Sequence, residues 1–217
     1  MSTAMLNEFL LATWQTIYMV LASGMIAIVF GLPLGVILLA TRQKDIMANK
    51  FCNLILSTIT NVVRSIPFII LMVAIIPLTR LLVGTSIGTT AAIVPLSIAA
   101  IPFVGRLVET ALNEVPSGLI ETGTAMGATP GQIILTILIP EALPGIINAI
   151  TITMISLIGY SAMAGAIGGG GLGDFAIRYG YHRFEASVMF VTIFVLVVIV
   201  QLVQFAGDYL ARKFTHR

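Results

Sequence analysis

The residues of this chain that could carry out chemistry are few and lie far apart. Its one cysteine, Cys52, has no second cysteine to pair with, which excludes an internal disulfide. Its two histidines, His182 and His216, are too widely separated to form a metal-ligand cluster. No nucleophile–base pattern is present, so we predict neither an enzyme nor a metal site.

The glycine-rich run GGGGLG, residues 168–173, formally contains the dinucleotide motif G-x-G-x-x-G. A dinucleotide site needs that motif directly after a strand, with an acidic partner further along a βαβ unit, and neither context is present. The P-loop motif G-x-x-x-x-G-K-S/T is absent, so the chain has no such site for ATP. We interpret the glycines as a tight turn with close helix packing.

The composition predicts a membrane protein. Of the 217 residues, 58% are hydrophobic and only 9% are charged, and the mean hydropathy is +1.07. A soluble domain carries roughly 25% charged residues, so too few charges remain here to coat a globule in water. The net charge of +2 is too small to indicate a nucleic-acid partner.

Charged residues divide the chain into five candidate spans, residues 9–41, 51–79, 81–105, 142–173 and 186–207. Each can supply the roughly 20 apolar residues that cross a bilayer core as a helix. The first stretch is too long for the apolar region of a signal peptide and has no basic segment before it, so we expect it in the mature protein. The sequence therefore predicts an all-α integral membrane protein. Small residues four apart, Gly31 with Gly35 and Ser161 with Gly165, would let its helices approach closely.

The distribution of basic residues decides whether the uncharged stretch 122–140 is a sixth span. With five spans, seven Lys and Arg residues share one side and three share the other. The positive-inside rule then places the N-terminus outside and the C-terminus in the cytoplasm. A sixth span would move the basic tail, 208–217, to the outside, so we predict five. The seven are Arg42, Lys44, Lys50, Arg106, Arg212, Lys213 and Arg217, and the three are Arg80, Arg178 and Arg183.

Residues 109–141 are then a long cytoplasmic loop between the third and fourth spans. Gly127 is well placed to end a first short helix in a left-handed cap. The letters TPGQ, residues 129–132, are typical of a capping box with proline in the first turn of a second helix. Pro140 stops or kinks that helix before the fourth span. We therefore predict a helix–turn–helix, which on loop chemistry alone could be a plain connector.

The spacing inside this loop follows a known pattern. Glu121 is followed six residues later by Gly127, ten further on by Ile137, and then by Pro140. This resembles E-A-A-x3-G-x9-I-x-L-P, the pattern of the loop with which ABC importer permeases dock into a cleft of their ATPase subunit. A Thr-Gly pair replaces Ala-Ala and an isoleucine replaces the leucine, and both substitutes are small or apolar as the site needs.

The resemblance covers nearly the whole chain. The stretches VVRSIPFIIL, GTSIGTTAAIVPL, IPEALPGIINA and GYSAMAGAIGGGGLGDFAIRYGY are similar to the methionine-importer branch of these permeases. It implies a multi-pass permease domain, 9–207, in the bacterial inner (cytoplasmic) membrane, followed by a basic cytoplasmic tail, 208–217. It also implies a homodimer that works with an ATP-binding subunit and an external substrate-binding protein or lipoprotein, and moves a small-molecule substrate. The chain itself would bind no cofactor, because the partner subunit uses the ATP.

The resemblance further implies roles for single residues. Glu121 would lie on the helix that meets the ATPase, where a carboxylate accepts hydrogen bonds, and Gly127 would permit the sharp turn, since a Cβ opposes positive φ. The expected ATPase-coupling residues are Glu121, Gly127, Ala128, Thr129, Ile137 and Pro140. Apart from the resemblance, if the glycine run 168–173 forms an external turn, the residues after it would face an incoming binding protein: Asp174, Arg178, His182 and Arg183.

Arg64 interrupts an otherwise apolar segment. Inserting an arginine at the centre of a membrane helix costs about 2.5–3.5 kcal/mol of free energy on insertion scales. Such an arginine therefore normally has a partner or faces water. A straight 29-residue helix would be about 43 Å long, however, so Arg64 could also lie near the cytoplasmic interface. Tyr160, Ser161 and Met163 are expected near mid-membrane depth. The candidate pathway or packing residues are Arg64, Ser65, Pro67, Tyr160, Ser161 and Met163.

Two other functions stay open. A permease for another small solute, such as a polar amino acid or an osmolyte, would share the docking loop. A secondary transporter driven by an ion gradient would be expected to carry membrane-embedded Asp or Glu, and none of the five spans has an acidic residue near its middle. The ten methionines are ordinary lipid-facing and core residues and do not indicate the substrate.

Overall fold

The computed structural model describes residues 3–42 and 46–215, and every regular element in these ranges is a helix. Lys44, His216 and Arg217 lie outside the described residues. The first half comprises α1 (Thr3–Ala40), α2 (Lys50–Ser65), α3 (Phe68–Ala74), α4 (Ile76–Val83) and α5 (Thr89–Asn113). The second half comprises α6 (Ser117–Ala125), α7 (Pro130–Gln132), η1 (Ile133–Leu138), α8 (Ile139–Glu141), α9 (Leu143–Ala166), α10 (Gly171–Phe175), η2 (Ala176–Tyr181) and α11 (Ala186–Phe214).

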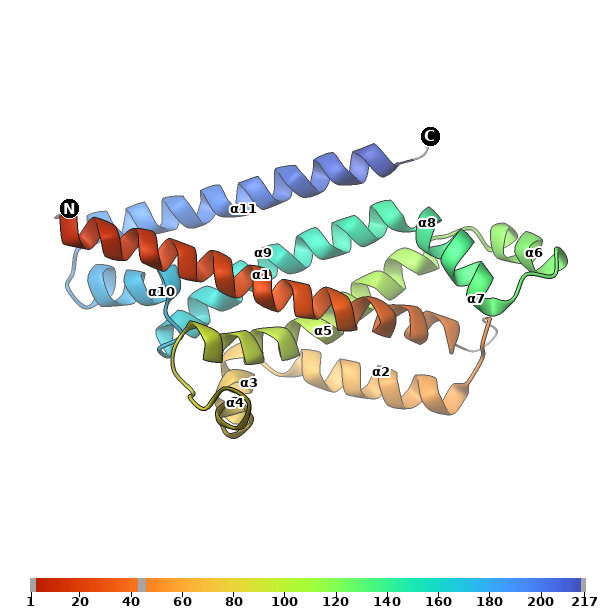
Figure 1. The fold of residues 1–217 in the computed structure, drawn as a ribbon, viewed down its shortest axis with the longest axis horizontal. Helices are drawn as coiled ribbons and strands as arrows, with labels where there is room; N and C mark the ends of the chain where they lie inside the picture. The colour runs from red at the N-terminus through yellow and green to blue at the C-terminus, as the bar shows by residue number, and fades with distance from the viewer. Residues whose placement is uncertain (1–2, 43–45, 216–217) are drawn as a thin grey trace.

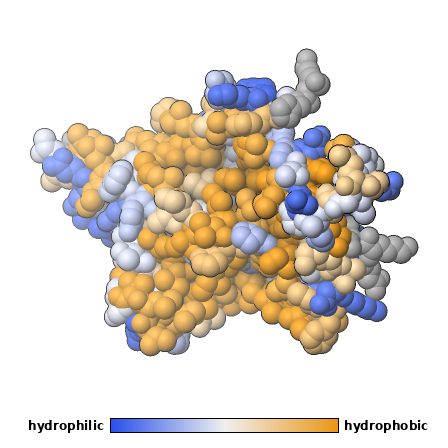
Figure 2. All heavy atoms as spheres, turned by 45° about the vertical axis from the view of Figure 1, so that its right-hand side comes forward, coloured by the Kyte–Doolittle hydropathy of each residue, from blue (hydrophilic) through white to orange (hydrophobic). Residues whose placement is uncertain are grey.

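The long helices α1, α5, α9 and α11 form an elongated bundle, with α10 at one end and α6 at the other (Figure 1). These four helices are long and apolar enough to cross a membrane, and the bent pair α2–α3 makes a fifth candidate if it is one span. Hydrophobic residues cover most of the face drawn in Figure 2, with hydrophilic residues toward its margins. Such a surface suits lipid rather than water.

The second predicted span, 51–79, is not one straight helix. Helix α2 ends at Ser65, and the axis turns by 103° before α3 begins at Phe68. Pro67 lies at this break, and a proline disfavours helical geometry in the residue before it; Ile66 is accordingly extended, with a ψ of 123°. The predicted 29-residue helix was therefore wrong, and Arg64 lies beside the break.

Two further boundaries differ from the prediction. Leu81 belongs to α4, which ends at Val83 with Gly84 as a left-handed cap (φ 81°), so the third long helix begins only at Thr89. The fourth long helix ends at Ala166 rather than at residue 173, because Gly168 and Gly170 adopt positive φ values of 88° and 77°. The uncharged stretches are longer than the helices because these glycine turns carry no charge.

The packing of α1 against α5 depends on two glycines. A Cβ on Gly31 would lie 2.6 Å from Val104 Cβ, and a Cβ on Gly35 would lie 2.6 Å from the Gly105 carbonyl oxygen. These separations are shorter than van der Waals contact, so side chains at either position would push the helices apart. The prediction that small residues four apart allow close approach is confirmed for this pair.

Replacing Gly35 with alanine is expected to lower the free energy of unfolding by about 1–3 kcal/mol, because the new methyl group overpacks the seam with α5. The matched control is Gly159→Ala in α9, where the new Cβ has no atom within 4 Å; this change is neutral or slightly stabilising, because alanine favours helix over glycine. Thermal unfolding of the detergent-solubilised protein measures both variants. Equal melting temperatures for Gly35→Ala and the unmodified chain would contradict this packing.

Candidate coupling segment and translocation route

The segment from α6 to α8 lies at one end of the bundle (Figure 1). It consists of α6, a turn over residues 126–129, and consecutive helical residues 130–141 that run through α7, η1 and α8. Pro116, directly before α6, occupies its N-cap position. The whole segment connects α5 to α9, so any force on it is transmitted to two long helices.

Gly127 forms the turn. Its φ is 80°, a left-handed value that side chains with a Cβ resist, and no atom lies within 4 Å of the position a Cβ would take. The requirement for glycine is therefore conformational rather than steric. The turn is closed by backbone hydrogen bonds in which Gly127 N–H donates to Thr124 O (2.9 Å) and Ala128 N–H donates to Gly123 O (3.0 Å).

Thr129 and Gln132 form the predicted capping box. Thr129 N–H donates to Gln132 Oε1 at 2.8 Å, and Gln132 N–H donates to Thr129 Oγ1 at 3.4 Å. Pro130 occupies the first helical position, where a backbone N–H has no acceptor within the helix, so the lack of one in proline loses no hydrogen bond. This start is followed by the π-helical turn η1, which no sequence signal indicated.

Helix α6 packs against η1 through Gly123, which is buried. A Cβ on Gly123 would lie 2.7 Å from Ile137 Cδ1 and 3.5 Å from Ile133 Cγ1. The half-buried Ile137 therefore holds the two helices of the segment together. Sequence reasoning treated Gly123 only as a substitute within the motif, and its contact with Ile137 depends on how the turn folds back.

Other candidate coupling residues are accessible. Glu121 is exposed on α6 and makes no hydrogen bond or ion pair with the described residues. Thr129 and Pro140 are exposed as well, whereas Ala128 is half-buried and packs against the core. The segment thus presents a free carboxylate on a surface whose shape is fixed by Gly123, Gly127 and the capping box.

Arg64 and Tyr160, from α2 and α9, line one cavity of about 140 Å³. The Arg64 guanidinium carbon lies 5.8 Å from the centroid of the Phe103 ring, and the Phe68 ring stacks on Tyr160 at 4.8 Å. Sequence reasoning missed both phenylalanines, because an aromatic residue within an apolar stretch carries no distinguishing signal. The lining residues are Val63, Arg64, Ile66, Phe68, Ala99, Phe103 and Tyr160.

The other candidate pathway residues do not line this cavity. Ser65 Oγ donates to Asn61 O and Ser161 Oγ donates to Ile158 O, both at 2.8 Å, so each hydroxyl is satisfied within its own helix. Ser161 is also fully buried, and Met163 is 48% exposed. Pro67 lies at the α2–α3 bend.

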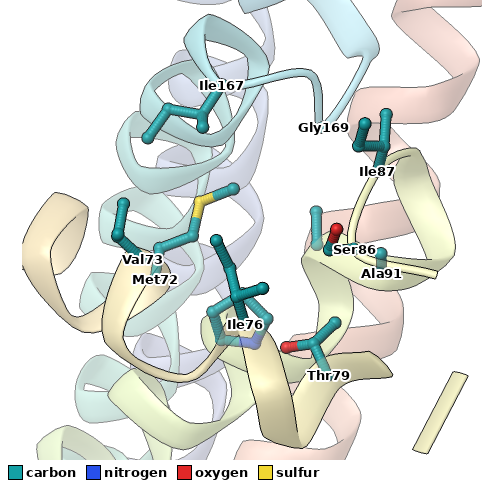
Figure 3. Close-up of a pocket in the computed structure, with 11 residues that line it drawn as sticks. Met72, Val73, Ile76, Thr79, Ser86, Ile87, Ala91, Ile167 and Gly169 are labelled. Atoms are coloured by element: carbon teal, nitrogen blue, oxygen red, sulfur yellow. The ribbon is translucent and has the colours of Figure 1, made fainter. Parts of the chain in front are cut away.

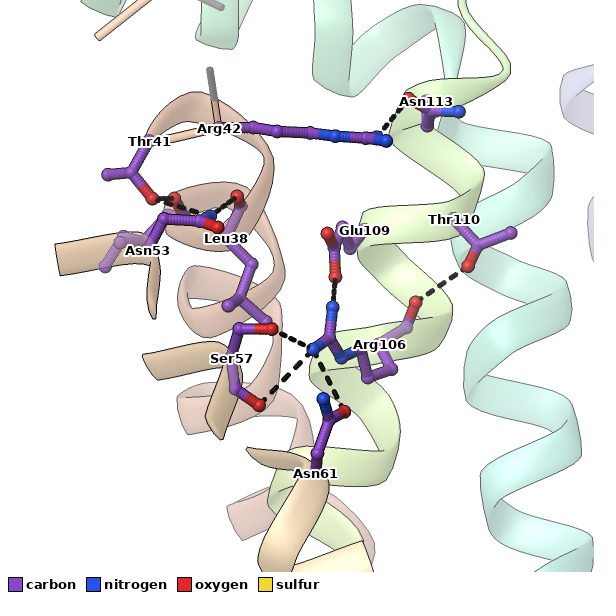
Figure 4. Close-up of polar contacts among 11 residues, drawn as sticks. Leu38, Thr41, Arg42, Asn53, Ser57, Asn61, Arg106, Glu109, Thr110 and Asn113 are labelled. Carbon is purple, nitrogen blue, oxygen red and sulfur yellow. Dashed lines mark hydrogen bonds and ion pairs between the residues drawn. The ribbon is translucent and has the colours of Figure 1, made fainter. Parts of the chain in front are cut away.

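A polar network joins α2 to α5 (Figure 4). Arg106 pairs with Glu109 on its own helix at 2.6 Å, and its other terminal nitrogen donates to the Ser57 hydroxyl and to Asn61 Oδ1, the latter at 3.0 Å. Arg106 Nε is buried and has no hydrogen-bond partner. Sequence reasoning used Arg106 only as a topological charge, since its partners on α2 become visible only in the folded chain.

The segment between α9 and α11 holds a charged cluster. Asp174 and Arg178 form an ion pair of 2.7 Å, and the hydrogen bond from Arg178 to Asp174 raises the pKa of Arg178 above its ordinary value. Tyr179 donates a hydrogen bond to Glu8 of α1, which raises the pKa of Tyr179. The Arg183 guanidinium carbon lies 4.4 Å from the centroid of the Tyr179 ring. Tyr179 and Glu8 are functional candidates that the sequence did not indicate.

His182 lies at the exposed tip of the same segment. Its ring meets the Tyr181 ring at 5.4 Å in an edge-on arrangement. Phe184 follows, 90% exposed and with a positive φ of 56°. The four predicted binding-protein contacts therefore lie on one short stretch, but His182 is separate from the Asp174–Arg178 pair.

The glycine run joins α10 to α1 and α9 at this end of the bundle. Gly171 N–H donates to Gln15 Oε1 at 2.9 Å, and Leu172 N–H donates to Thr16 Oγ1 at 2.8 Å. A Cβ on Gly173 would collide with the Ala162 backbone. The prediction of a tight turn with close helix packing is confirmed.

A second cavity, of about 220 Å³, lies beside the glycine run between α3, α4 and the start of α5 (Figure 3). Its walls are apolar except for the hydroxyls of Thr79 and Ser86. Ile167 and Gly169 border it from the loop after α9. Residues 3–42 and 46–215 contain no group of three or more His, Cys, Asp or Glu side chains that could hold a metal ion.

An all-helical bundle with four to five candidate spans and an apolar surface defines an integral membrane protein. Residues 27–216 match the model of the family described as binding-protein-dependent transport system inner membrane component. The chain belongs to this family, and its place is therefore the inner membrane.

Curated relatives are similar over most of the chain. Identity is 57% over 214 residues with a probable D-methionine transport system permease protein MetI of Vibrio cholerae serotype O1, covering 98% of this chain and 95% of the relative. It is 54% over 165 residues with the D-methionine transport system permease protein MetI of Escherichia coli (strain K12), covering 76% of each.

Solved structures show the same architecture. A chain of the MetNI methionine ABC transporter, described as inward facing, matches over 100% of both chains with a TM-score of 0.97 and 52% identity. A chain of an amino acid ABC transporter with histidines matches with a TM-score of 0.79 over 95% of this chain and 94% of that one. At 19% identity, the second likeness shows the fold alone.

Proposed function

We propose that the chain is the permease subunit of an ATP-driven importer for methionine. The observation that carries this proposal is the whole-length likeness, with a TM-score of 0.97 and 52% identity, to a chain of the MetNI methionine ABC transporter. The two D-methionine transport permeases named above support it as well, because their sequences are 54–57% identical to this chain. Since the chain has no P-loop motif, an ATP-binding partner supplies the energy, and the chain itself is the transport subunit rather than the enzyme.

In this proposal the permease domain, 9–207, crosses the membrane five times, with α2 and α3 together as one span. The N-terminus is outside, and the α6–α8 segment and the basic tail, 208–217, are cytoplasmic. Two observations support this orientation. The C-terminal end of α11 and the α6 segment lie at the same end of the bundle, opposite the start of α1 (Figure 1). The end of α1 at Ala40 and the start of α2 at Lys50 lie toward that end as well (Figure 1), so the basic residues of the loop between them agree with the positive-inside rule.

The α6–α8 segment transmits the conformational change. Two copies of the chain pair with two ATPase subunits, and each exposed Glu121 accepts hydrogen bonds from its ATPase. Because Gly123, Ile137 and the turn at Gly127 fix the shape of the segment, movement of the ATPase pair moves α5 and α9 with it. Coupling requires contacts that differ between the two states, since a partner bound equally in both shifts nothing.

Transport then follows alternating access. ATP binding closes the ATPase pair and turns the two bundles outward, and an external substrate-binding protein delivers its ligand to the end that carries Asp174, Arg178, His182 and Arg183. Hydrolysis returns the bundles inward.

The rival function, a secondary transporter, would need an acidic residue available for ion coupling. The acidic residue in α5 is Glu109, and its carboxylate is already paired with Arg106 at 2.6 Å. This pairing leaves Glu109 unsuited to ion coupling.

ATP-dependent uptake of labelled D- or L-methionine is expected in proteoliposomes that hold this chain, its ATPase and its binding protein. Excess unlabelled methionine competes with the label, and a preparation without ATP is the control. ATP hydrolysis without methionine uptake would assign the permease to another small solute, such as a polar amino acid or an osmolyte. Failure of any ATPase to assemble with the chain would contradict the permease proposal itself.

Glu121→Lys is expected to weaken co-purification of the ATPase about ten- to a hundredfold, because a charge-assisted hydrogen bond of about 1.5–3 kcal/mol is lost and replaced by an unfavourable charge. The matched control is Glu185→Lys, the same charge change at the exposed residue directly before α11, which begins at the opposite end of the bundle (Figure 1). Pull-down of the ATPase by the tagged permease measures both, with membrane insertion checked in parallel. Undiminished ATPase recovery with Glu121→Lys would refute the coupling role.

A further inference from the structure

Arg64 is a cation in the membrane region that has no acidic partner. The two ion pairs among residues 3–42 and 46–215 join Arg106 to Glu109 and Arg178 to Asp174. Arg64 instead lies exposed in the last turn of α2, beside the 103° break, with its guanidinium over the Phe103 ring. A charge in this position needs water or an anion to stabilise it.

The cavity next to Arg64 combines that single cation with apolar walls. Phe68 and Tyr160 stack on one another, Phe103 lies beneath the guanidinium, and Val63, Ile66 and Ala99 complete the lining. Such a site complements a small molecule that has a carboxylate at one end and an apolar side chain at the other. Thioether sulfur also makes favourable contacts with aromatic rings. Transporter substrate sites are often formed where membrane helices are discontinuous, and Arg64 lies beside such a break.

A polar stripe on α2 leads from this cavity toward the opposite end of the helix. Its members recur at spacings of three and four, which places them on one helix face. A third cavity, of about 390 Å³, lies at the far end of the stripe and is lined by Arg42, Lys50, Asn53, Leu54 and Ser57. Asn53 and Ser57 are half-buried and the other members are exposed, so none of the stripe is closed off from water. The stripe consists of Lys50, Asn53, Ser57, Asn61 and Arg64.

We propose that Arg64 binds the carboxylate of the transported amino acid, with the side chain against Phe68, Phe103 and Tyr160, as a weak internal site of the permease. This inference rests on the proposed transport of an amino acid. The guanidinium fork matches a carboxylate in a bidentate geometry. The ligand leaves along the α2 stripe toward Lys50 and Arg42, which have no acidic partner among the described residues and offer further positive charge to the same carboxylate. The site is weak because a transported ligand must be released.

Saturation-transfer NMR on the permease–ATPase complex in nanodiscs, without the binding protein, tests the site. The probe is methionine of the transported enantiomer. Saturation is expected to reach its S-methyl protons, because they lie against three aromatic rings. Methionine methyl ester, which lacks the carboxylate charge, is expected to bind at least tenfold more weakly. Arg64→Gln is expected to weaken methionine binding at least tenfold, and Arg64→Lys, which keeps the charge but loses the planar fork, less than that.

The matched control is Arg80→Gln. Arg80 is exposed on α4 and donates to Ser86 Oγ at 3.2 Å, away from the Arg64 cavity. Its loss is expected to leave methionine binding unchanged, and co-elution with the ATPase checks that every variant assembles. Equal binding by Arg64→Gln and the unmodified complex, or no saturation transfer in the unmodified complex, would overturn the site. ATP-dependent methionine uptake by the same preparation would then leave the proposed function intact, whereas absence of uptake would overturn both.

Discussion

Hydrocarbon surroundings offer no water to polar groups, and this constraint governs the whole chain. Every regular element is therefore a helix within the described residues, and hydroxyl side chains bond to their own backbone. Thr153 Oγ1 donates to Ala149 O and Thr192 Oγ1 donates to Val188 O, both at 2.8 Å. The larger polar groups gather at two places, in the cluster around Tyr179 and where α2 meets α5. The second place is where a water-filled route between long helices would be least costly.

The same constraint explains how the helices hold together. Apolar side chains gain little by leaving lipid for a neighbouring helix, so packing depends on close backbone approach at small residues. Gly31 and Gly35 provide it between α1 and α5, and Gly173 provides it between α10 and α9. Close backbone contact at these glycines therefore holds α1 against α5 and α10 against α9.

Local signals in the sequence predicted much of this structure. The capping box at Thr129 and Gln132 and the left-handed turn at Gly127 depend only on nearby residues. The five apolar stretches predicted the membrane class. The charged residues between them, however, mark where apolar segments end and not where helices end. The break at Pro67 was therefore missed, although the proline itself was a candidate residue.

Sequence patterns could not predict the tertiary contacts. The contact of Gly123 with Ile137 depends on the fold of the turn between them, and the network of Arg106 depends on α2 lying against α5. Phe68 and Phe103 become notable only because the α2–α3 bend brings them beside Arg64. The coupling and pathway assignments themselves remain predictions until variants are measured.

Thiol reactivity along α2, in the assembled transporter, tests most directly whether this helix borders a water-filled route. Single cysteines replace residues on two faces of α2 in a chain without Cys52, and a charged, membrane-impermeant thiol reagent is added to inside-out vesicles. The polar-face positions are Asn53, Ser57 and Asn61, and the apolar-face positions are Ile55, Ile59 and Val62. The account predicts fast reaction at the polar-face positions and protection at the apolar ones. Protection of both faces, or faster reaction on the apolar face, would contradict it.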